Sequence, residues 1–150
     1  MKIYFAADHA GFELKKTLMT FVCDELGYEV EDMGAYELDN EDDYPDFIAK
    51  AASVVSDAPE TARAIILGGS GQGEAMVANR FSGVRAVVYY GGNEKIISLS
   101  REHNDANILS LGARFVDEKE AVDVLKLWLE TPFSGDERHV RRIKKIDKTV

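Results

Sequence analysis

The sequence predicts an α/β fold in which helices cover both faces of a five-stranded parallel sheet, a three-layer αβα sandwich of the Rossmann or flavodoxin type. Short β-branched apolar runs alternate with segments whose apolar residues recur at helical spacing. This alternation indicates a parallel sheet, because a parallel strand pair needs a long crossover connection, usually a helix. At 150 residues the chain has the length of a single domain with one substantial core.

Five short segments predict the strands. Residues 2–7 alternate in polarity, and residues 84–89 are apolar nearly throughout, as expected of a parallel strand that is covered on both faces. The remaining strands are expected at residues 28–32, 63–67 and 107–111.

The helices are predicted by their apolar period and by the residues at their ends. Gly27 ends the first helix, Pro45 is tolerated in the first turn of the second, and Asn93 and Asp117 can cap the fourth and fifth. The helices are expected at residues 12–26, 44–56, 74–80, 93–101 and 117–130. The remaining segment, residues 135–150, predicts a charged helix with few apolar positions, so we expect it to pack on a partner subunit.

Charge and hydropathy exclude several classes of function. The formal net charge of −9 argues against a general nucleic-acid binder, because phosphate backbones would be repelled. No apolar run approaches the roughly 18 residues of a membrane span, and the first apolar residues run straight into Asp8 and His9, so a cytoplasmic protein is expected. Basic residues gather between Arg138 and Lys148, and a local cationic patch suits a small anionic ligand.

Cys23 is the only cysteine. It sits among Leu18, Phe21 and Val22 at helical spacing, which predicts a small buried hydrophobe rather than a nucleophile. A single cysteine also excludes a disulfide framework and a cysteine metal site.

The stretch at residues 65–74 is the strongest local signal in the chain. A β-branched run ends in four glycines within six residues, and a helical pattern starts at once, so backbone amides should cluster at a helix N-terminus where an anion can bind. The loop also places Ser70 and Glu74 in one small volume. It lacks the Lys-Ser/Thr of a P-loop, and Glu74 stands where the dinucleotide fingerprint needs its third glycine. A tight turn without a ligand, with Glu74 as a helix cap, is the alternative.

Two other loops carry polar clusters. Asp8 and His9 follow the first strand, and residues 101–105 (Arg-Glu-His-Asn-Asp) precede the fifth. We expect the fold to bring the tips of these loops and the glycine loop together. Residues 101–105 follow a helix rather than a strand, so the sequence does not decide at which edge of the sheet they lie. Arg138 and Arg142 lie at i and i+4, where both could reach one phosphate, but spacing alone favours a solvated basic helix.

Taken in order, these motifs resemble the ribose-5-phosphate isomerase B family, which also contains the galactose-6-phosphate isomerase subunits. The resemblance is collinear over almost the whole chain and implies a metal-free, cofactor-free aldose–ketose isomerase that works as a homodimer or homotetramer with sites at the subunit interface. The matching motifs are Ala7-Asp8-His9-Ala10-Gly11, Asp43-Tyr44-Pro45, Gly68-Gly69-Ser70-Gly71-Gln72-Gly73-Glu74, Ala78-Asn79-Arg80, Arg101-Glu102-His103-Asn104 and Arg138-His139-Val140-Arg141-Arg142.

The resemblance also implies roles for individual residues. In one branch of the family a cysteine at the position of Gly68 is the base; this sequence is similar to the other branch, whose base is the glutamate found here as Glu74. His103 would open the sugar ring, Asp8 would contact the ring oxygen or hydroxyls, and Ser70 would help to move protons between O1 and O2. The binding residues would be His9, Arg138 and Arg142 for the phosphate, Arg114 as a further arginine of the glutamate branch, and Asn104 with the amides of Gly69, Gly71 and Gly73 for the substrate oxygens.

We therefore expect the chain to interconvert ribose 5-phosphate and ribulose 5-phosphate, a reaction of pentose phosphate metabolism, through a cis-enediolate. A six-carbon substrate such as allose or galactose 6-phosphate is an alternative within the same chemistry. A non-catalytic sugar-phosphate-binding protein is the alternative from another class. The presence of both Glu74 and His103 counts against a binding protein, because binding needs neither.

Overall fold

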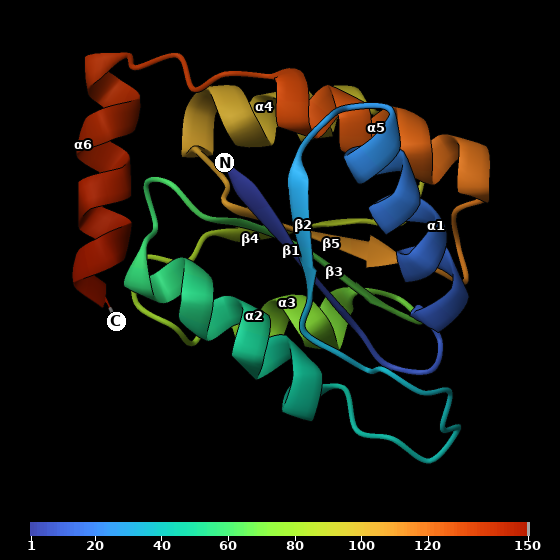
Figure 1. Ribbon diagram of the computed structural model, residues 1–150. Coiled ribbons are helices and arrows are strands. Elements are labelled where there is room, and N and C mark those ends of the chain that lie inside the picture. Colours follow the sequence, from blue (N-terminus) through green and yellow to red (C-terminus); the bar gives the residue numbers. More distant parts are fainter. Residues whose placement is uncertain (150) are drawn as a thin grey trace.

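A computed structural model describes residues 1–149, and its elements follow the predicted order of strands and helices (Figure 1). The strands are β1 (Lys2–Ala7), β2 (Glu29–Asp32), β3 (Arg63–Gly68), β4 (Ala86–Tyr89) and β5 (Ile108–Gly112). The helices are α1 (Phe12–Asp24), α2 (Pro45–Asp57), α3 (Gln72–Ala78), α4 (Lys95–Asn104), α5 (Glu118–Glu130) and α6 (Glu137–Ile146), followed by the 3-10 turn η1 (Asp147–Thr149). Residue 150, the end of the predicted last helix, lies outside the described residues.

The five strands form one parallel sheet in the order β2-β1-β3-β5-β4. The connections β1 to β2 and β4 to β5 run in one direction across the sheet, and the other two run in the opposite direction. Because such crossovers are right-handed, α1 and α4 must lie on one face and α2 and α3 on the other. Figure 1 shows this arrangement, with α5 beside α1. The predicted αβα sandwich is therefore confirmed.

The central strands bury side chains toward both helical layers. Ile65 packs with the layer of α1, α4 and α5, whereas its neighbour Ile66 packs with the layer of α2 and α3, because successive strand residues face opposite sides. Full burial on both faces holds for β5 and for β3 beyond its first residue, Arg63. The same expectation is wrong for β4: it is an edge strand, and its residues 86–88 are only partly buried.

The prediction that Cys23 is buried is wrong, because its side chain is exposed. Helix α1 buries Leu18 and Val22 instead, and the next residue along the helix turns toward solvent. The same helix buries Lys15, which its charge did not indicate.

Lys15 is fully buried and bonded at its tip. Its Nζ donates to Asp32 Oδ1 at 2.6 Å and to the carbonyl of Ala35 at 2.7 Å. Burial lowers the pKa of Lys15, and the hydrogen bond to Asp32 opposes that shift. The segment held in this way pairs with the end of β1, where the amide of Ala35 donates to the carbonyl of Ala7 at 2.7 Å. The lysine therefore fixes the backbone next to Asp8.

Helix α6 stands beside the layered body, near the amino ends of the strands (Figure 1). Arg85 ties the end of α6 to the sheet through Asp147, with 3.7 Å between Nη1 and Oδ1. Most side chains of α6 are exposed, as its composition predicts, and His139 is the residue that it buries. No helix within residues 1–149 combines the length and the apolar composition that crossing a bilayer requires.

Replacing Asp32 with alanine should lower the free energy of unfolding by about 2–4 kcal/mol, because it leaves the Lys15 ammonium buried without its anion. Urea unfolding followed by the fluorescence of Trp128, the only tryptophan, measures the change. Glu31→Ala is the matched control, since Glu31 lies on the same strand but pairs with Lys2 in solvent and should contribute little. Equal losses in the two variants would contradict the role of the buried pair.

Candidate active site

The glycine loop leaves the carboxyl end of β3, at the centre of the sheet, and is fixed by the neighbouring strand. Gly71 begins α3 with a φ of +76°, a left-handed conformation that favours glycine. Its carbonyl accepts a hydrogen bond from Ser110 Oγ at 2.7 Å, and the carbonyl of Gly69 accepts one from the amide of Arg114 at 3.1 Å. Ser70 Oγ accepts from the amide of Gln72 at 3.3 Å. The loop is thus held rigidly between the ends of β3 and β5.

Glu74 is buried against the backbone of Gly68, and only 4 % of it is exposed. A Cβ built on Gly68 would lie 1.7 Å from Glu74 Oε1, so the carboxylate occupies space that any other residue at position 68 would fill. Burial raises the pKa of Glu74; a backbone hydrogen bond within the residue opposes this shift, and the charge of Asp8 adds to it. A carboxylate with a raised pKa is suited to general base catalysis near neutral pH.

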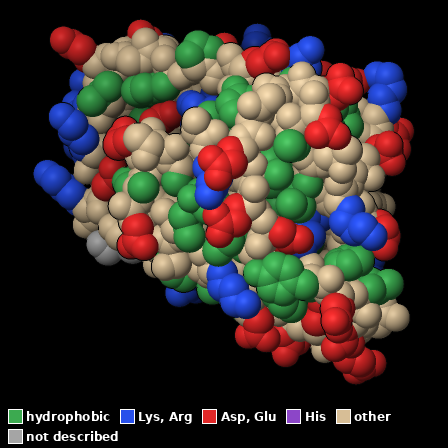
Figure 2. All heavy atoms as spheres, in the orientation of Figure 1, with side chains coloured by type: hydrophobic (Ala, Val, Ile, Leu, Met, Phe, Trp, Pro, Cys, Tyr) green, Lys and Arg blue, Asp and Glu red, His purple; other side chains and the backbone are tan. Residues whose placement is uncertain are grey.

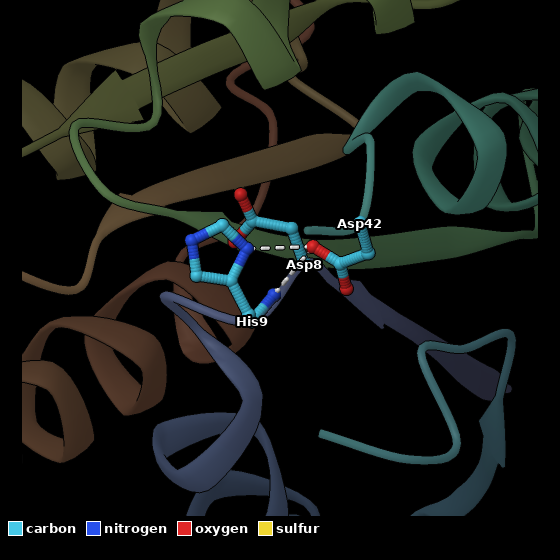
Figure 3. Close-up of side chains that lie close together, drawn as sticks. All are labelled: Asp8, His9 and Asp42. Carbon is cyan, nitrogen blue, oxygen red and sulfur yellow. Dashed lines mark hydrogen bonds and ion pairs between the residues drawn. The ribbon is translucent and has the colours of Figure 1, made fainter. Parts of the chain in front are cut away.

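Asp8, His9 and Asp42 form a second group beside the loop (Figure 3). Asp8 is buried, and its Oδ1 accepts hydrogen bonds from the amides of Ala10 at 2.9 Å and Gly11 at 3.3 Å. His9 Nδ1 lies 2.6 Å from Asp42 Oδ1. This hydrogen bond raises the pKa of His9, whereas partial desolvation and the charge of Arg114 lower it. The side chains of His9 and Arg114 are therefore near each other at this edge of the sheet.

Donor atoms of Asp8, His9 and Asp42 lie within 4.8 Å of one another, so by residue type this group could hold a metal ion. The His9 nitrogen and the Asp42 oxygen are already bonded to each other, and Asp8 Oδ1 is bonded to backbone amides. The geometry is that of a histidine paired with a carboxylate.

A cavity of about 490 Å³ opens beside the glycine loop. The ring of Tyr44 closes one side by lying against Gly73, where an added Cβ would meet the ring at 2.7 Å. The cavity combines loop amides and an arginine with the buried carboxylate, so it can bind an anionic ligand and remove a proton from it. Its lining residues are Tyr44, Gly69, Ser70, Gly73, Glu74, Arg114 and Phe115.

His103 belongs to a different cluster, at the junction of α4 and α6. Its ring stacks on that of His139, with the centroids 4.3 Å apart and the planes at 15°. Burial lowers the pKa of His139, and the charges of His103 and Arg138 lower it further. The cluster also contains Arg142, which acts on His139 in the same direction, and Asn104, the exposed last residue of α4.

Within one chain the two clusters lie at opposite edges of the sheet. Glu74 follows the carboxyl end of β3, whereas His103 precedes the amino end of β5, and a five-residue strand spans about 17 Å. Figure 1 shows α6 and the end of α4 on the side away from the carboxyl ends of the strands. The expectation that all three loops meet is therefore wrong for residues 101–105, because a helix that leads into a parallel strand ends at that strand's amino edge.

The structure divides the predicted site residues into two groups. The first group, at the carboxyl edge, contains Asp8, His9, Gly69, Ser70, Gly71, Gly73, Glu74 and Arg114. The second, at the amino edge, contains His103, Asn104, Arg138 and Arg142.

Asp42, Phe115 and His139 were not predicted as site residues. Asp42 is one carboxylate in a long acidic stretch, and its only sequence signal is its position just before the Asp43-Tyr44-Pro45 motif. His139 follows Arg138 and precedes Val140, and nothing in the sequence pairs it with His103.

An open parallel sheet with an amide-lined loop, a buried carboxylate and an arginine in one cavity defines an α/β domain suited to bind a small anionic ligand and to abstract a proton from it. Residues 3–146 match the sequence family described as Ribose/Galactose Isomerase. The chain belongs to this family.

Individual relatives agree with this assignment. Ribose-5-phosphate isomerase B of Mycolicibacterium paratuberculosis is 39% identical over 144 residues, which cover 95% of this chain and 87% of the relative. The crystal structure of ribose-5-phosphate isomerase B from Mycoplasma genitalium with bound ribulose 5-phosphate is similar with a TM-score of 0.93 at 36% identity, covering 99% of this chain and 95% of that one. The Clostridium thermocellum enzyme gives a TM-score of 0.91 at 40% identity, with coverages of 99% and 97%.

Glu74→Gln should raise the melting temperature by a few degrees at pH about 8. The folded-state pKa of Glu74 lies above its ordinary value of 4.5, so the native protein holds this proton more tightly than the unfolded chain does. The contribution of Glu74 to stability therefore falls as the pH rises through the raised pKa, and a neutral glutamine avoids that loss.

Calorimetry at several pH values measures the difference, which should shrink as the solution becomes acidic. Glu41→Gln, which changes an exposed glutamate, is the control and should not show this pattern. A clear fall in the melting temperature of Glu74→Gln at pH about 8 would contradict the unfavourable burial of the charge.

Proposed function

We propose that the protein is a ribose-5-phosphate isomerase of type B that interconverts ribose 5-phosphate and ribulose 5-phosphate through a cis-enediolate. The observation that carries the proposal is the position of the Glu74 carboxylate, which is buried against Gly68 beside the glycine loop. Burial there raises its pKa. Family membership and the bound ribulose 5-phosphate in the Mycoplasma genitalium relative support the choice of substrate.

In this proposal Glu74 removes the proton from C2 of the open-chain sugar and returns it to C1. Negative charge develops on O1 and O2 in the enediolate, and the amides of Gly69, Gly71 and Gly73 are preorganised donors for it. Ser70, which lines the cavity, helps to transfer protons between the two oxygens. The protein fits the glutamate branch of the family, because a cysteine at position 68 would collide with the Glu74 carboxylate.

The sugar must be open before C2 can lose its proton. In the proposal His103 catalyses the ring opening. Asp8 contacts the ring oxygen or the hydroxyls, and Asn104 binds a substrate oxygen. His9, Arg138 and Arg142 bind the phosphate, and Arg114 is a further cation at the glycine loop. Binding of the remote phosphate holds the sugar in register with Glu74, which converts binding energy into rate.

Because His103, Arg138 and Arg142 lie at the other edge of their own sheet, we propose that they serve the glycine loop of a second copy. The assembly is then a homodimer, or a homotetramer built from two such dimers, with α6 packing on the partner subunit. Exposed apolar side chains beside the loop support this: Met76, Tyr90 and Phe115 are 66%, 54% and 63% exposed. The rings of Tyr90 and Phe115 also contact each other edge to face, 6.2 Å between centroids.

Glu74→Gln should lower kcat by roughly 10²- to 10⁴-fold and change KM by only a few-fold, because the phosphate contacts remain. In the native enzyme kcat/KM should fall on acidification through the raised pKa of Glu74, at a higher pH than an exposed glutamate would give. A coupled assay for ribulose 5-phosphate, with allose and galactose 6-phosphates as further substrates, measures both quantities. Near-normal turnover in the variant would exclude Glu74 as the base.

Mixing two inactive variants should restore activity if each site uses two chains. Co-expression of Glu74→Gln with His103→Ala pairs the subunits at random, so half of the dimers are mixed and each mixed dimer has one native site. About a quarter of the native activity is expected. If one chain supplied both residues, the mixture would be no more active than the two variants assayed separately.

A further inference from the structure

We propose that Asp42 is a positioning residue for the ligand-binding imidazole of His9, fixing its ring through Nδ1 so that Nε2–H faces the anionic group of the substrate. This inference rests on the proposed function, in which His9 binds the phosphate. It assigns a role to the loop before α2, where the sequence shows only a run of acidic residues.

Two hydrogen bonds connect His9 to Asp42. A single oxygen, Asp42 Oδ1, lies 2.6 Å from His9 Nδ1 and 3.1 Å from the backbone nitrogen of His9. Figure 3 shows both bonds converging on that oxygen while the other ring nitrogen points away from Asp42. One carboxylate oxygen therefore holds both the backbone and the ring of His9, which leaves the imidazole little freedom to rotate.

The burial of Asp42 strengthens this contact. Its side chain is 7% exposed, whereas that of His9 is 25% exposed, so the carboxylate lies beneath a ring that still reaches solvent. The second oxygen, Oδ2, is buried and receives no hydrogen bond from the described residues. A carboxylate placed for stability alone would be better solvated or better bonded. Its position is explained by the histidine that it holds.

The protonation state of the ring follows from the same contact. When Nδ1–H is donated to a carboxylate, a neutral imidazole presents a lone pair at Nε2, which repels a phosphate oxygen. Only the imidazolium donates from both nitrogens. The hydrogen bond to Asp42 and the charge of Asp8 favour the imidazolium, while partial desolvation and Arg114 oppose it. The loss of Asp42 would therefore weaken the anion site through charge as well as orientation.

The test compares Asp42→Asn with the native protein. Asparagine can still accept both hydrogen bonds through Oδ1, so the change removes the charge and keeps the shape. KM for ribose 5-phosphate should rise on the order of 10-fold at pH about 8, with kcat little changed. The rise of KM with pH should also begin at a lower pH than in the native enzyme, because His9 loses its proton earlier. A role confined to stability would not move this pH profile.

NMR of labelled histidine rings in the full chain provides the second measurement. The chain has only three histidines, so the signals can be assigned by substitution. In Asp42→Asn the pKa of His9 should fall toward the ordinary value of 6.5. Asp42→Glu, which keeps the charge, should retain more of the raised pKa. Glu41→Gln, which removes one exposed charge from the adjacent position, should match the native protein in both measurements.

The outcomes separate the two proposals. An unchanged His9 titration in Asp42→Asn, or an unchanged KM profile, would overturn the role of Asp42. A native protein that does not isomerise ribose 5-phosphate would overturn the proposed function instead, and the NMR titration would still decide whether Asp42 controls His9.

Discussion

The carboxylate of Glu74 occupies the space that a side chain at residue 68 would fill, and this contact connects the fold to the chemistry. Gly68 ends the central strand, so the carboxylate is placed at the middle of the sheet's carboxyl edge, where loop amides, Asp8 and the cavity converge. Burial there raises the pKa of Glu74 at a cost in stability. The rigid turn at Gly71 and the bond from Ser110 keep the loop in the one shape that permits the contact.

The fold could be predicted because its signals are local. Strand and helix patterns located the strands and helices among the described residues. Of the two predicted caps, Asp117 is confirmed, with its Oδ1 accepting from the amide of Glu120 at 2.8 Å, whereas α4 begins after Glu94 rather than after Asn93. The failures needed information about partners distant in sequence. Lys15, on α1, can be buried because Asp32, on β2, pairs with its ammonium group. Cys23 is exposed because α1 turns the face that carries Leu18 and Val22 toward the core. The order of the strands leaves β4 at an edge, which its composition cannot reveal.

The residues of the candidate site likewise divide into those that local sequence could place and those that it could not. Ser70 and Glu74 lie a few residues apart on one turn, so the sequence could place them together. His103 could be identified by its motif but not located, because its side of the sheet depends on which end of α4 carries it. The sequence could not distinguish Asp42 from the neighbouring acidic residues, because its partner His9 is 33 positions away in the chain.

In the proposed function Glu74 and His103 act in one site, although they lie at opposite ends of the strands of their own sheet, and this arrangement limits how the activity can be controlled. No hinge within the chain can unite two groups fixed at opposite ends of the same strands, short of unfolding the sheet. Activity would then follow the concentration of assembled subunits rather than the fraction of folded chain. On this proposal a separated subunit would lack a complete site, and a compound that kept two subunits apart would inhibit without entering the cavity.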